Sequence, residues 1–115
     1  MPGYRPEHKA VLDSLLLPHP HVRAGKMFGY PAYYVGKKLC ICLYEEGVGI
    51  KVPAQTAAAL LATDPNAVPF QPMGKPKMRE WVQINLASSE AYRQYAPVFE
   101  ESIQYIHEQQ GSSDA

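Results

Sequence analysis

The chain has 115 residues and a formal net charge of zero, because eleven Lys and Arg residues balance eleven Asp and Glu residues. This length supports one domain, since half of it would bury too little surface for an independent core. The charge balance argues against broad phosphate neutralisation as the main source of affinity. Two cysteines cannot form a disulfide framework.

Neither a membrane span nor a secretion signal is visible in the sequence. No apolar run approaches the roughly twenty residues that cross a bilayer, and the first ten residues, MPGYRPEHKA, lack the apolar stretch of a signal peptide. We therefore expect a cytoplasmic, globular protein with no membrane partner.

The first half of the chain predicts a helix followed by a meander. Residues 7–17 carry apolar side chains at helical spacings, and two prolines follow them. Three short apolar stretches separated by glycine-containing turns predict an antiparallel meander: residues 30–35, 39–44 and 48–52. Residues 22–28 fit either an irregular lead-in or a further edge strand.

The second half predicts a helix, two strands and a final helix. Residues 54–62 are rich in alanine, and residues 80–86 alternate apolar and polar side chains, as a half-buried strand does. Prolines restrict a short strand at residues 70–73 to a sheet edge. We expect Ser88 or Ser89 to cap the last helix and Pro97 to kink or restart it.

This order of elements predicts an α+β fold. Its antiparallel sheet has about five strands, with the helices mainly on one face, in the order α-β-β-β-α-β-β-α. We expect a single domain over residues 1–110 and a frayed C-terminal tail over residues 111–115.

A series of short motifs resembles a known family. The motifs are KMFGYPAYYVGKKLCICLYEEGVGIKV at residues 26–52, PF at 69–70, GKPKM at 74–78 and EWVQI at 80–84. In this order they resemble the N-terminal domain of TfoX-like proteins, and they are similar to the MmcQ/YjbR-like and YdhG-like groups of small bacterial domains. The resemblance implies a two-layer fold and a bacterial, non-secreted protein. TfoX-like proteins are associated with the regulation of natural competence, and the family supplies no catalytic motif.

Two pairs of residues are candidate metal or redox sites. Cys40 and Cys42 are expected to share one face of a strand. We favour a structural role for both thiols, packed on the sheet, over metal binding, because a closed zinc site needs about four ligands and no second cysteine pair exists. His19 and His21 flank a proline, lack the i, i+4 spacing of a metalloprotease motif, and read as a polar surface connection. We therefore expect no metal and no cofactor.

Charge is divided unevenly along the chain. Residues 1–79 hold ten basic and five acidic residues, whereas residues 80–115 hold one basic and six acidic residues. The densest basic cluster, Lys75, Lys77 and Arg79, is a candidate contact for phosphate or an acidic partner, although a solvated loop explains the same pattern.

No phosphate-binding loop, nucleophile elbow or convergent acid–base set is visible. The leading hypothesis is therefore a non-enzymatic interaction or regulatory domain. The alternative is a nucleic-acid-binding module that uses residues 75–81, from Lys75 to Trp81, and an enzyme or metal protein ranks last.

The sequence also predicts an interaction surface. Residues 39–44 are apolar on both faces, and three helices are too few to cover both faces of the sheet. We therefore expect Cys40, Cys42, Tyr44 and Trp81 to form an exposed, partly apolar patch that mediates association, as a homodimer or with another protein. The alternative is that the C-terminal helix, bent at Pro97, covers this face.

Overall fold

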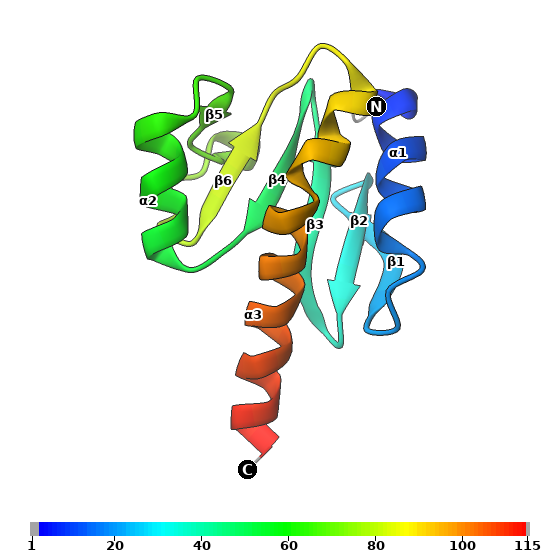
Figure 1. The fold of residues 1–115 in the computed structure, drawn as a ribbon, viewed down its shortest axis with the longest axis vertical. Helices are drawn as coiled ribbons and strands as arrows, with labels where there is room; N and C mark the ends of the chain where they lie inside the picture. Colours follow the sequence, from blue (N-terminus) through cyan, green and yellow to red (C-terminus); the bar gives the residue numbers. More distant parts are fainter. Residues whose placement is uncertain (1–2, 115) are drawn as a thin grey trace.

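The computed structural model describes residues 3–114 of the chain, with side chains for residues 3–110. Within that range the fold is α+β, as the sequence predicts (Figure 1). The helices are α1 (Pro6–Leu16), α2 (Ala54–Thr63) and α3 (Ala96–Asp114), with short 3₁₀ helices η1 (Pro72–Gly74) and η2 (Ser89–Tyr95). The strands are β1 (Val22–Met27), β2 (Tyr30–Val35), β3 (Lys38–Tyr44), β4 (Gly47–Lys51), β5 (Ala67–Val68) and β6 (Trp81–Ile84).

The six strands form one antiparallel sheet in the order β1-β2-β3-β4-β6-β5. The first four are a meander, and β1 is an edge strand, which decides between the two interpretations of residues 22–28. The prediction of a strand at residues 70–73 is wrong. Residues 70–73 are not extended, because Pro72 begins the η1 turn and Met73 has a positive φ of 57°. The strand between α2 and β6 is instead β5.

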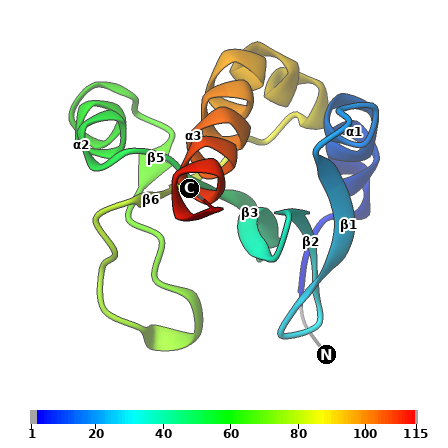
Figure 2. The ribbon, with the colours of Figure 1, turned by 90° about the horizontal axis from the view of Figure 1, so that it is seen from below.

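All three α-helices lie on the same face of the sheet (Figure 2). α1 buries Val11, Leu12 and Leu16, and α3 buries Phe99, Ile103 and Ile106, which recur at helical spacing. Together with the inward side chains of the central strands, these residues form the main hydrophobic core.

The junction before α3 differs in part from its prediction. Pro97 restarts the helix, since η2 ends at Tyr95 and the proline occupies the first turn of α3, where a missing amide hydrogen costs nothing. The prediction that Ser88 or Ser89 caps a helix is wrong: Ser88 makes no capping hydrogen bond, and Ser89 Oγ lies 2.6 Å from His8 Nδ1. α3 includes residues 111–114, whereas Ala115, in the predicted tail, lies outside the described residues.

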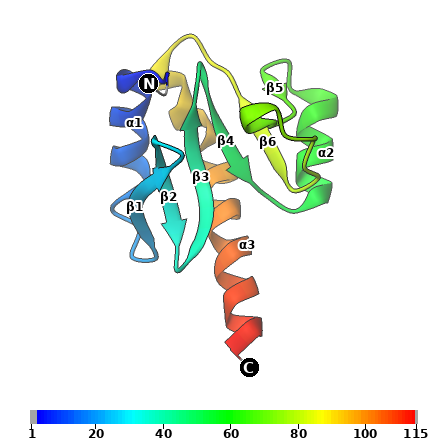
Figure 3. The same ribbon diagram turned by 180° about the vertical axis from the view of Figure 1, so that it is seen from behind.

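On the β4–β6 side, the rear face of the sheet is covered by the segment between β5 and β6 rather than by an α-helix (Figures 2 and 3). Phe70, from this segment, is only 1% exposed, and its ring lies 5.1 Å from the ring of Trp81 and 5.7 Å from that of Tyr44. A Cβ atom at Gly49 would come within 2.7 Å of the Phe70 ring, so β4 needs glycine where the two meet. Phe70 thus builds a second, smaller core behind the sheet.

Candidate functional site

The two cysteines do not share a face of β3. Tyr33 pairs with Ile41 and Tyr34 with Leu39, so Cys40 is an extra residue that forms a β-bulge. Cys40 Sγ therefore faces α3, 3.2 Å from Ser102 Oγ, whereas Cys42 belongs to the rear core. The prediction of a shared face is wrong, because a bulge shifts the alternation of side chains by one residue.

The predicted exposed patch is also wrong. Cys40 and Cys42 are 0% exposed and Trp81 is 9% exposed. Tyr44 is half-buried, and its hydroxyl accepts a hydrogen bond of 3.0 Å from the backbone amide of Met73. The segment between β5 and β6 occupies the face that the patch was expected to present, so these four residues offer no continuous interface.

Both thiols are expected to be unreactive in the native protein. Burial raises the pKa of Cys40 to about 11 and that of Cys42 to about 12, and the thiolate is the reactive form. Iodoacetamide at pH 8, followed by mass spectrometry, should leave both unmodified in buffer and modify both in denaturant. Rapid labelling of either thiol in buffer would contradict the buried assignment.

The structure brings three of the four histidines together. His21 stacks on His107 of α3 with ring centroids 3.9 Å apart, and the His19 and His21 rings lie 5.4 Å apart. His19 Nε2 lies 3.3 Å from Glu100 Oε1. Stacked rings turn their faces, not their nitrogen atoms, toward each other. No group of three or more metal-ligating side chains converges anywhere in the described part of the chain.

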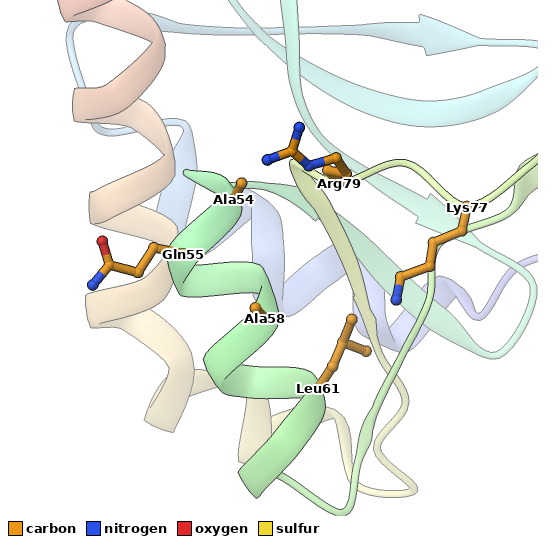
Figure 4. Close-up of a pocket in the computed structure, with 6 residues that line it drawn as sticks. All are labelled: Ala54, Gln55, Ala58, Leu61, Lys77 and Arg79. Atoms are coloured by element: carbon orange, nitrogen blue, oxygen red, sulfur yellow. The ribbon is translucent and has the colours of Figure 1, made fainter.

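The predicted basic cluster is split by the structure. Lys75 lies over the ring of Phe28, with Nζ 5.5 Å from the ring centroid. Lys77 and Arg79 instead line a groove of about 420 Å³ on the side of α2 (Figure 4). We call this groove, lined by Ala54, Gln55, Ala58, Leu61, Lys77 and Arg79, the basic groove.

One wall of the basic groove is an apolar ridge of α2. Ala54, Ala58 and Leu61 are spaced i, i+4 and i+7 and so follow one side of the helix. Leu61 points toward Lys77, and the Arg79 guanidinium lies toward the Ala54 end (Figure 4). The two cations thus mark the two ends of a small apolar shelf.

The electrostatic environment of the groove favours an anion. None of its six lining residues is acidic, and within residues 3–110 neither Lys77 nor Arg79 forms an ion pair. α2 begins after Pro53 without a side-chain cap, which leaves partial positive charge on the amides of its first turn. Both cations are exposed, so an incoming anion would not have to displace an internal partner.

Sequence reasoning identified the cations of the groove but missed its apolar wall. The only signal was an i, i+4, i+7 ridge in an alanine-rich helix, and such a ridge gives no indication of which segment packs beside it.

No protein-family model, curated protein or solved structure matches this chain. Within the described residues, no helix is both long enough and apolar enough to cross a membrane. The structure itself describes an α+β domain with a six-stranded antiparallel sheet and a basic groove beside α2.

Proposed function

We propose that this protein is a non-enzymatic interaction domain that binds an anionic group of a partner in the basic groove. The observation that carries the proposal is the pair of cations, Lys77 and Arg79, on the wall of a groove with no acidic lining residue. Cations without internal partners, beside a concave apolar surface, suit an acidic ligand.

The two cations have different roles in this proposal. Arg79 presents a planar guanidinium that can hold a carboxylate or phosphate by two parallel hydrogen bonds, and Lys77 acts as a point charge. The apolar shelf of Ala54, Ala58 and Leu61 would contact the aliphatic part of the side chain that carries the anion.

The composition of the groove supports binding rather than catalysis. Its lining contains no His, Cys, Ser, Asp or Glu side chain, so Lys77 has no second group on this wall with which to form a nucleophile–base pair.

We also propose membership of the TfoX-like group, with a bacterial origin, a cytoplasmic location and a regulatory role. The support is the order of the motifs along the fold. Met-Phe-Gly ends β1 and forms the turn to β2, Pro-Phe contains the Phe70 anchor, and the late tryptophan begins β6.

Removal of both cations should weaken the binding of an acidic peptide. We expect Lys77→Ala/Arg79→Ala to bind a fluorescein-labelled hexaglutamate peptide roughly fivefold more weakly than the wild type, since each exposed ion pair contributes about 0–1 kcal/mol. Fluorescence anisotropy at low salt measures this difference.

The matched control is Lys37→Ala/Lys38→Ala, which removes the same charge from two exposed residues at the start of β3 and in the turn before it. Equal loss of affinity in both double variants would mean that general charge, not the groove, attracts the peptide, and would overturn the proposal.

A nucleic-acid-binding function is the second candidate, and one observation favours it. Phe28 is 62% exposed beneath Lys75, so the pair offers a stacking surface beside a cation. Trp81, in contrast, is buried by Phe70 and cannot stack on a base.

The same anisotropy assay with a single-stranded DNA 12-mer separates the candidates. Three phosphate contacts would give a log–log salt slope of about −2, and tight binding at physiological salt would favour nucleic acid over the acidic peptide.

A further inference from the structure

A second groove lies between the start of α2 and α3, and its charge is opposite to that of the basic groove. Its volume is about 540 Å³. Three carboxylates of α3 line it, from Glu100, Glu101 and Glu108, together with the neutral Gln104.

Two of these carboxylates have internal partners, and neither partner is a lysine or an arginine. Glu101 accepts a hydrogen bond of 2.7 Å from Thr56 Oγ1, and Glu100 lies 3.3 Å from His19. Within residues 3–110, none of the three forms an ion pair with a lysine or an arginine.

The spacing on α3 matches the spacing of the basic groove. Glu101 and Glu108 are seven residues apart, which is about 10.5 Å along a helix. Ala54 and Leu61, which mark the ends of the apolar shelf, are also seven residues apart, with Arg79 toward one end and Lys77 toward the other. A helix with carboxylates two turns apart therefore fits against this shelf, with a carboxylate near each cation.

We propose that the basic groove docks α3 of a second copy of this chain, with Glu101 and Glu108 of one copy against Lys77 and Arg79 of the other. The proposal rests on the anion-binding function proposed above and names the partner of that site. Gln104, between the two carboxylates on the same side of α3, then lies over the apolar shelf.

The overall charge of the chain favours this pairing. With a net charge of zero and a pI near 6.9, two copies do not repel each other at neutral pH, while positive and negative charges lie on separate surfaces. Exposed ion pairs contribute only about 0–1 kcal/mol each, so the complex is weak and salt-sensitive. The screening length falls from about 30 Å at 0.01 M salt to about 3 Å at 1 M.

Charge reversal tests the pairing directly in the full chain. By sedimentation equilibrium at low salt, we expect the average mass of the wild type to rise with concentration and to return to the monomer value at high salt. Lys77→Glu/Arg79→Glu and Glu101→Lys/Glu108→Lys should each remain monomeric. An equimolar mixture of these two variants should associate again, because every reversed surface then meets its complement. Lys37→Glu/Lys38→Glu, with the same charge change at two residues that line neither groove, should behave as the wild type.

Three results would overturn the pairing: a monomeric wild type at roughly 200 μM in about 0.01 M salt, self-association of Glu101→Lys/Glu108→Lys, or no association in the mixture. Circular dichroism checks that the variants fold, and Glu101→Gln/Glu108→Gln tests the same contact without introducing repulsion. A wild type that binds hexaglutamate through the groove but stays monomeric would refute the second copy as partner and leave the binding function intact. A wild type that neither binds hexaglutamate nor self-associates would refute both the pairing and the proposed function.

Discussion

Replacement of Phe70 by alanine is expected to lower the free energy of unfolding by about 3–5 kcal/mol, the usual cost of deleting a buried aromatic ring. Phe70 is 1% exposed, contacts Gly49 of β4 and lies 5.1 Å from the Trp81 ring. It is also the anchor that holds the segment between β5 and β6 against the rear of the sheet. Its loss should therefore expose Trp81 as well as destabilise the fold.

The same substitution should weaken hexaglutamate binding about as much as removal of both cations does. Lys77 and Arg79 form one wall of the basic groove only while their segment stays in place beside α2. Urea denaturation followed by circular dichroism gives the stability change, and a red shift of tryptophan emission reports the exposure of Trp81, the one tryptophan of the chain. Gln71→Ala, at the exposed neighbouring position, is the control. If Phe70→Ala binds the peptide as the wild type does, the groove does not depend on this anchor.

Phe70 also shows where sequence reasoning reached its limit. The two-sided apolar pattern of β3 suits a strand that is covered on both faces, yet the small number of helices led to the expectation of an exposed patch, and that expectation is wrong. The cover itself was not predictable, because residues 69–80 contain three prolines and no helical or strand periodicity. A segment without periodicity gives no information about which of its side chains points inward.

The cysteines illustrate a second limit. The alternation rule holds for residues in regular strands, and it correctly separated Trp81 from Val82 and Ile84 in β6. It failed at Cys40 because one residue of β3 has no partner in β2. A bulge of this kind depends on pairing between two strands, so the composition of one strand does not reveal it.

The basic groove could not be predicted from the sequence, because it depends on contacts between segments that are far apart in the chain. The cluster of Lys75, Lys77 and Arg79 is visible in the sequence. Its separation into two places depends on the sheet order β4-β6-β5, which puts Lys77 and Arg79, just before β6, beside α2. Lys75 instead reaches the turn between β1 and β2, nearly fifty residues earlier in the chain. Contacts over such separations follow from the topology as a whole.

Acidification from neutral pH is expected to destabilise the fold through His8. The ring is 0% exposed, its Nδ1 lies 2.6 Å from Ser89 Oγ, and it meets the Tyr92 ring edge-on at 4.8 Å. Among the described residues, Nε2 is buried without a hydrogen-bond partner. Burial lowers the pKa of His8 below its ordinary value of 6.5, and the nearby Arg5 lowers it further. The native state therefore holds this imidazole neutral.

The direction of the pH dependence follows from proton binding. Between about pH 6.5 and the lower pKa of His8 in the folded state, the unfolded chain protonates His8 and the folded chain does not, so the unfolded state gains stability. Each pH unit between the two pKa values removes about 1.4 kcal/mol from the free energy of unfolding, and above about pH 7.5 this contribution is constant.

Urea denaturation between pH 5 and 8 measures the slope of the free energy of unfolding against pH. His8→Asn, which keeps a polar atom near Ser89 but does not titrate, should flatten the slope even if it lowers stability at every pH. His107→Gln, at an exposed position on α3, should leave the His8 contribution in place. A His8→Asn variant with the wild-type slope would show that other groups cause the acid sensitivity, and that the α1–η2 contact does not depend on a neutral imidazole.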